Sequence, residues 1–159
     1  LALDHRSERF EEALLDATDG RGVDVVCDPV GGEVAEASFR CVARNGRYVM
    51  VGFSAGGGAD APRIAPRPVV MGNFALLGVL LAYSRDPAPL KRMLGANLVP
   101  RPVGEAVHAD LLAQLERGAI RPVVGEALPF SELPAALERM EARESVGRTV
   151  LRLEPTDDR

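Results

Sequence analysis

The sequence predicts an α/β fold, namely the C-terminal part of a doubly wound parallel sheet, and three apolar runs carry that prediction. The first two, Val23 to Cys27 and Arg47 to Val51, are short, rich in β-branched residues and separated by a segment with helical spacing. The third extends from Phe74 to Leu81. Because parallel neighbours need crossover connections, the order strand, helix, strand, loop, strand indicates a parallel sheet covered by helices.

The segments around these runs follow helix and turn signals. Ser7 is the expected N-cap of a first helix that ends near Gly20. A second helix is expected from Glu33 to Arg44, where the Asn45-Gly46 pair should stop it. We expect the first strand to be buried on both faces, and residues 54–72, which are rich in Gly and Pro, to form a loop.

The C-terminal third contains clearer signals after a weak stretch that begins beyond Tyr83. A helix is expected to end at Gly118, and residues 121–130 then read as extended. Ser131 is the expected N-cap of the next helix, with Pro134 early enough in that helix to be tolerated. An alternating strand is expected near residues 147–155.

Composition limits the classes of function. The 159 residues suit one ordinary domain, and the formal net charge of −4 offers no broad basic field for nucleic acid. The longest uninterrupted apolar stretch, Phe74 to Ala82, is about half the length that a membrane helix needs. Cys27 and Cys41 lack CxxC spacing, so we expect reduced, buried thiols in a cytoplasmic protein.

Candidate chemistry lies where the predicted strands end, because open parallel sheets bind ligands outside the carboxyl ends of their strands. Asp28-Pro29-Val30-Gly31-Gly32 follows the first strand, Gly52-Phe53-Ser54-Ala55-Gly56 follows the second, and Leu80, Leu81, Ala82 and Tyr83 come after the third. Small residues there let a flat ligand approach the backbone. For any one of these loops alone, the simpler interpretation is a glycine that only makes a tight turn.

Three phrases taken together are more specific than any loop: D-x-V-G-G from Asp28, G-R-Y-V-x-V-G-F from Gly46, and P-F-S-E-L-P-A-A-L-E followed by G-R-T-V-L near the C-terminus. In order and spacing, nearly the whole chain resembles the C-terminal half of zinc-free medium-chain dehydrogenase/reductases of the quinone oxidoreductase type. The resemblance implies a Rossmann domain over residues 1–125, and a segment over residues 126–159 that returns to complete a separate catalytic domain.

The resemblance also implies an enzyme that transfers hydride from NADPH, or from NADH, to a quinone or an α,β-unsaturated carbonyl, with no metal. The first loop would pass under the adenosine and ribose side of the cofactor, the second would lie along the nicotinamide, and the third strand's end would flank the carboxamide. The family's Gly-Lys pair is Gly147-Arg148 here, a departure that keeps the positive charge. The implied cofactor-binding residues are Asp28, Pro29, Val30, Val51, Gly52, Phe53, Ser54, Gly78, Val79, Leu80 and Arg148.

The Gly-rich pyrophosphate fingerprint is absent from this sequence, and the chain begins with Leu1 rather than Met. We therefore expect the fingerprint and a substrate domain upstream, and we expect the chain alone to be inactive. No residue reads as an obligatory catalytic acid or base, which matters little for hydride transfer because the cofactor carries the chemistry. In such enzymes the third strand, Phe74 to Leu81, commonly pairs with its counterpart, so we expect a homodimer.

Other interpretations start from single residues. His5 and His108 read as solvated surface histidines rather than metal ligands. Ser54 lies in G-F-S-A-G, which echoes a hydrolase nucleophile elbow but is followed by a Gly/Pro loop instead of a helix. Tyr83 could donate to a substrate carbonyl, although packing is the commoner role. Two alternatives to a free-standing reductase stay open: an inert binding or scaffolding domain without its phosphate loop, and an enoyl reductase module of a polyketide synthase.

Overall fold

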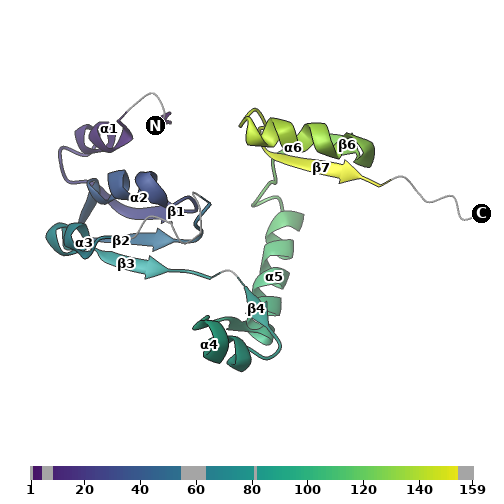
Figure 1. Cartoon of the computed structure of the whole chain (residues 1–159), viewed down its shortest axis with the longest axis horizontal. Coiled ribbons are helices and arrows are strands. Elements are labelled where there is room, and N and C mark those ends of the chain that lie inside the picture. Colours follow the sequence, from purple (N-terminus) through teal and green to yellow (C-terminus); the bar gives the residue numbers. More distant parts are fainter. Residues whose placement is uncertain (1, 5–8, 55–63, 81, 154–159) are drawn as a thin grey trace, which may run out of the picture. The chain divides into compact units, whose positions relative to one another are not determined.

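A computed structural model describes residues 2–4, 9–54, 64–80 and 82–153 (Figure 1). Contacts divide the chain into two compact units, Leu1–Gly104 and Glu105–Arg159. The domain boundary expected at residue 125 stays a prediction. Within the described ranges, no helix combines the length and the apolar character needed to cross a bilayer.

Three parallel strands form the centre of the first unit. They are β1 (Val23–Asp28), β2 (Val42–Met50) and β3 (Ala75–Gly78), hydrogen-bonded in the order β1-β2-β3. Both pairs are parallel, and Figure 1 shows the three arrows pointing the same way. The predicted parallel arrangement is confirmed, and it brings the three carboxyl ends to one edge of the sheet.

Strand β2 starts earlier than predicted, so the expected helix up to Arg44 is wrong. Helix α2 ends at Phe39 (Gly32–Phe39), and the chain is already extended from Val42. The Asn45-Gly46 pair makes an irregularity inside the strand instead of a helix end: Asn45 has a φ of 63°, and the pairing with β1 shifts at this point. The Asn45 N–H donates to the Asn73 carbonyl at 2.7 Å, so this kink is held by the segment before β3.

One face of the sheet carries the core. Helices α2 and α3 (Pro66–Gly72) contact each other and β2. The Phe39 ring meets the Tyr48 ring edge-on at a centroid distance of 4.7 Å. The prediction that residues 54–72 form only a loop missed α3, whose prolines lie in its first turn, where a missing N–H costs nothing. The buried apolar cluster consists of Ala35, Phe39, Val42, Tyr48 and Phe74.

The opposite face of the sheet is exposed among the described residues. Val25 is 57% exposed and Leu77 is 41% exposed, while Cys27 is exposed as well. The expected burial of the first strand on both faces is therefore wrong, because α2 and α3 pack on one face only. The expectation of two buried thiols holds for Cys41 and fails for Cys27.

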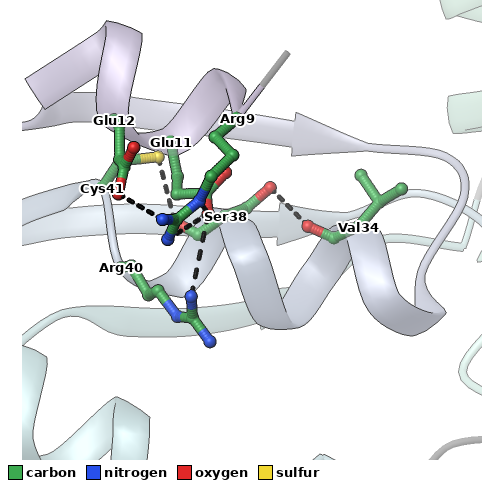
Figure 2. Close-up of polar contacts among 7 residues, drawn as sticks. All are labelled: Arg9, Glu11, Glu12, Val34, Ser38, Arg40 and Cys41. Carbon is green, nitrogen blue, oxygen red and sulfur yellow. Dashed lines mark hydrogen bonds and ion pairs between the residues drawn. The ribbon is translucent and has the colours of Figure 1, made fainter. Parts of the chain in front are cut away.

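Helix α1 (Phe10–Asp16) precedes the sheet and ends before the predicted Gly20. Its Glu11 carboxylate is almost buried and lies 3.5 Å from Nε of Arg9 and 3.7 Å from Nη1 of Arg40, just after α2 (Figure 2). The ion pair between Glu11 and Arg40 connects α1 to the end of α2. The expected N-cap, Ser7, lies outside the described residues, and Arg9 occupies the N-cap position of α1.

A small parallel pair follows β3 in the first unit. Strands β4 (Tyr83–Ser84) and β5 (Val99–Pro100) flank α4 (Ala88–Leu94), and α5 (Arg101–Glu116) begins directly afterwards. The Tyr83 ring fills the space that a side chain at Gly104 would need. Tyr83 thus packs against α5, although part of it remains exposed.

The second unit contains β6 (Val124–Pro129), a short 3-10 helix (Phe130–Glu132), α6 (Leu133–Glu141) and β7 (Arg148–Arg152). Strands β6 and β7 pair in parallel. Ser131 lies inside the 3-10 turn and Glu132 is the N-cap of α6, so the predicted serine cap is wrong, whereas Pro134 lies in the first turn as predicted. The Glu126 carboxylate accepts from Arg139 at 3.1 and 3.2 Å and from the Thr149 hydroxyl at 3.1 Å, which links the three elements.

Candidate functional site

The carboxyl ends of the three strands, with the residues that follow each of them, lie together at one edge of the sheet, and we call these segments the strand exits. The Val51 N–H donates to the Asp28 carbonyl at 2.9 Å, and the Val79 N–H donates to the Met50 carbonyl at 2.8 Å. The residues that follow β2 and β3 are therefore each bonded to the last residue of the preceding strand. Three groups of predicted cofactor residues are brought together in this way: Asp28 to Val30, Val51 to Ser54, and Gly78 to Leu80.

The loops after β1 and β2 are in direct contact. The Pro29 carbonyl accepts from the Ser54 N–H at 3.3 Å and from the Ser54 hydroxyl at 3.2 Å. A Cβ atom at Gly52 would lie 2.7 Å from the same carbonyl oxygen. Only glycine fits this approach, so the G-F-S turn is shaped by the neighbouring loop as well as by its own sequence.

The Asp28 side chain faces inward rather than toward a ligand. It is 4% exposed, and its carboxylate accepts the Val30 N–H at 2.7 Å and the Gly31 N–H at 3.0 Å. It also accepts the Tyr48 hydroxyl. The carboxylate thus folds the loop after β1 back on itself, while the backbone of that loop forms the rim of the exit.

Tyr48 is the residue of this site that the sequence analysis did not single out. Its side chain is fully buried. Asp28 pairs with Met50, so Tyr48, two residues earlier, lies on the same face and diagonal to Asp28. The sequence did contain one signal for this residue, namely a hydroxyl-bearing side chain among the apolar core positions of the strand. Its hydrogen-bond partner, Asp28, could not be predicted, because it depends on the register between β1 and β2.

The environment of Tyr48 keeps its hydroxyl protonated. Burial, then the hydrogen bond to Asp28 and the charge of that carboxylate, raise the pKa of Tyr48 well above its usual value. At neutral pH the hydroxyl is a permanent donor to Asp28. The pair is therefore a fixed structural link.

Most of the exposed side chains at the exits are apolar, and Ser54 is the polar exception. Phe53 is 76% exposed, and Val79 and Leu80 are exposed after β3. Gly31, with a φ of 75°, leads into α2, whose first-turn N–H groups have no acceptor within the helix. A flat ring could rest on the apolar rim, and backbone donors lie at the start of α2 for carboxamide or phosphate oxygens. These features fit a dinucleotide.

Arg148 belongs to the second unit. It opens β7 after Gly147, which has a φ of 74°, and the Arg148 N–H donates to the Val123 carbonyl at 2.7 Å. Its side chain is exposed. A role for Arg148 beside a cofactor stays a prediction.

The structure offers little support for the two other candidate chemistries, a metal site and a nucleophilic serine. Among the residues that the structure describes, no group of three or more His, Cys, Asp or Glu side chains could hold a metal ion. His108 is exposed on α5, whereas His5 lies outside the described residues, as do Ala55 and Gly56 of the G-F-S-A-G motif. The Ser54 hydroxyl donates to a backbone carbonyl, which is a loop contact and not a nucleophile–base pair.

Comparisons with known proteins agree with this architecture. The profile of a family described as zinc-binding dehydrogenase matches residues 1–151. Quinone oxidoreductase-like protein 2 homolog from Nematostella vectensis is 24% identical over 151 residues, which cover 94% of this chain. A highly reducing polyketide synthase, phiA, from a fungal species is 30% identical over 153 residues, or 96% of this chain.

Solved structures show the same fold. A mycobacterial protein complexed with NADPH superposes with a TM-score of 0.69 at 24% identity, covering 94% of this chain and 41% of that protein. The chain spans 37% of the Nematostella protein and 5% of the polyketide synthase. The similarity thus concerns one part of each of these larger proteins.

Proposed function

Because this chain belongs to the zinc-binding dehydrogenase family, among the medium-chain dehydrogenase/reductases of the quinone oxidoreductase type, we propose that it supplies half of the cofactor site of an NADPH-dependent oxidoreductase. The observation that carries the proposal is the meeting of three parallel strand exits, with Gly52 lying directly against the Pro29 carbonyl. Doubly wound sheets bind dinucleotides at such an edge.

In this proposal the chain binds and orients, and the bound cofactor supplies the hydride. Val51 to Ser54 lie along the nicotinamide, with the exposed Phe53 beside its ring. Gly78, Val79 and Leu80 flank the carboxamide, and the backbone of Asp28 to Val30 lies under the ribose. Holding the nicotinamide against an acceptor in a fixed orientation is the protein's main contribution to rate.

The acceptor we propose is a quinone or an α,β-unsaturated carbonyl. A second candidate, an enoyl reductase module, is favoured by the 30% identity to the fungal polyketide synthase. The two differ in the acceptor, which for the module would be an enoyl thioester.

We further propose a zinc-free site, NADPH in preference to NADH, a cytoplasmic location, and a homodimer formed through β3, which is an edge strand of the described sheet.

The test of cofactor binding is a fluorescence titration of the purified protein with NADPH. We expect saturable binding, and we expect Phe53→Ala to weaken it by about threefold to tenfold, because a ring face is lost. Met71→Ala is the matched control, since Met71 is an equally exposed apolar side chain of the same unit but lies in α3, before the start of β3, at the opposite end of that strand from Val79 and Leu80. Absence of NADPH binding by the full-length protein would support the inert domain instead.

The test of the acceptor follows the loss of NADPH absorbance with two substrates. Turnover with a simple quinone but not with crotonyl thioester supports the quinone reductase. The reverse result supports the enoyl reductase module. Neither outcome depends on the Phe53 variants, so binding and acceptor choice are tested separately.

A further inference from the structure

We infer that Tyr48 is a positioning residue of the proposed cofactor site, acting through Asp28 to set the two loops that follow β1 and β2. The inference rests on the proposed function, because it concerns the same edge of the sheet. It assigns a role in binding to a side chain that is fully buried and never reaches the edge itself.

The first step is the bond between neighbouring strands. The Tyr48 hydroxyl donates to Oδ2 of Asp28, and the same oxygen accepts the Gly31 N–H at 3.0 Å. Oδ1 accepts the Val30 N–H at 2.7 Å. The carboxylate therefore accepts one hydrogen bond from Tyr48 in the neighbouring strand and further hydrogen bonds from the N–H groups of Val30 and Gly31 in its own loop.

The second step is that the loop after β1 is bonded to the loop after β2. The Pro29 carbonyl, directly after Asp28, accepts both the N–H and the hydroxyl of Ser54. Gly52 packs on the same carbonyl, and the Val51 N–H is bonded to the Asp28 carbonyl. Rotation of the Asp28 side chain would therefore move the peptide on which the G-F-S turn rests.

The third step explains why the position holds tyrosine. The ring's edge-on contact with Phe39 would also be made by phenylalanine. The hydroxyl adds the bond to Asp28, whose buried carboxylate has no Lys or Arg ion pair within the described part of the chain. A buried charge is costly unless hydrogen-bond donors surround it, and the Tyr48 hydroxyl adds a third donor to the N–H groups of Val30 and Gly31, which keeps the carboxylate in one orientation.

The experiment compares Tyr48→Phe, Asp28→Asn and the double variant in the full-length protein, with NADPH titrated at a temperature at which every variant is folded. We expect each single change to weaken NADPH binding about tenfold, as the loss of one charge-assisted hydrogen bond would. The double variant should be no weaker than the weaker single variant, since both changes remove the same link. Val42→Ala is the control, because it thins the same core cluster and should lower the melting temperature without changing NADPH affinity.

The outcomes separate the inference from the proposed function. If the unaltered protein does not bind NADPH, the proposed function fails. If it binds NADPH and Tyr48→Phe binds as tightly, or if Val42→Ala weakens binding as much as Tyr48→Phe does, Tyr48 is only a core residue and the inference is wrong. Should Tyr48→Phe fail to fold, Asp28→Asn still tests the inference: unchanged NADPH binding in that variant would show that the two loops do not depend on the carboxylate through which Tyr48 acts.

Discussion

The carbonyl oxygen of Pro29 lies 2.7 Å from the point that a Cβ atom would occupy at Gly52. These two residues follow different strands and are separated by more than a whole helix and strand in the chain, yet each limits the other's backbone. Gly78 is the last residue of β3 and lies at the same edge of the sheet, but a Cβ atom there would meet nothing within 4 Å. The two glycines therefore respond differently to a methyl group.

Gly52→Ala is expected to destabilise the protein by about 1–3 kcal/mol, because the new methyl overlaps a backbone atom that cannot rotate away. Gly78→Ala should leave the free energy of unfolding within about 0.5 kcal/mol of the original value. It should still weaken NADPH binding, since the added methyl fills space that the proposed carboxamide contact needs. Urea denaturation and NADPH titration measure the two effects. Equal loss of stability in both variants would contradict the geometry.

Tyr48 is expected to resist ionisation in the folded protein. Burial and the hydrogen bond to Asp28 raise its pKa above the ordinary value of 10.0. The folded state therefore favours the neutral phenol: its contribution to stability is complete below about pH 10 and is lost as the pH rises through the folded pKa. In a Tyr83→Phe chain, where Tyr48 is the remaining tyrosine, the phenolate absorbance should appear only together with unfolding. A phenolate signal that precedes the loss of circular dichroism would argue against a buried hydroxyl.

The two cysteines are expected to differ in alkylation. Cys27 is exposed, whereas Cys41 is 1% exposed and burial, followed by the nearby Glu11 carboxylate, raises its pKa. Because the thiolate is the reacting form, Cys41 should be slow on both counts. Mass spectrometry after iodoacetamide treatment should find one label on the native chain and two on the denatured chain. With Cys27→Ser as the control, a native chain that still takes up label would show that Cys41 is accessible.

The contact between Glu126 and Arg139 is expected to stabilise the second unit only modestly. Both side chains are about one third exposed, so solvent screens the pair, and a coupling energy of about 0.5–1 kcal/mol is expected from a double-mutant cycle. The cycle uses Glu126→Gln and Arg139→Gln, with denaturation measured at low and high salt. Arg117→Gln, an exposed arginine just after α5, is the control and should not couple to Glu126. A coupling that salt does not reduce would mean that the pair is shielded from solvent.

The sequence correctly predicted those elements that depend only on a few adjacent residues. The parallel strands β1, β2 and β3 were expected from apolar runs, and the turn at Gly31 from its glycines. Errors arose where neighbours decide the outcome. Val42 to Arg44 have helical spacing, but they belong to β2, where Val42 pairs with Val23 of β1. Pro66 to Gly72 form a helix that packs on α2. Ser131 could cap a helix by its type, yet the chain enters α6 through a 3-10 turn.

The candidate site divides in the same way. The residues that follow the strands could be named in advance, because connectivity alone sends the three exits of parallel strands to one edge. The inward turn of Asp28 and its bond with Tyr48 could not, since these depend on which residues of β1 and β2 lie opposite each other.

By itself the sequence determined the direction of the chain through the sheet, the small residues at its exits and the family to which it belongs, because these depend on local preference and order along the chain. Only the tertiary structure decided which face of the sheet is covered, where β2 begins, and how Tyr48, Asp28 and Pro29 connect the two loops. Such contacts join residues that are distant in sequence, and their geometry follows from register and packing, which no short stretch of the chain encodes.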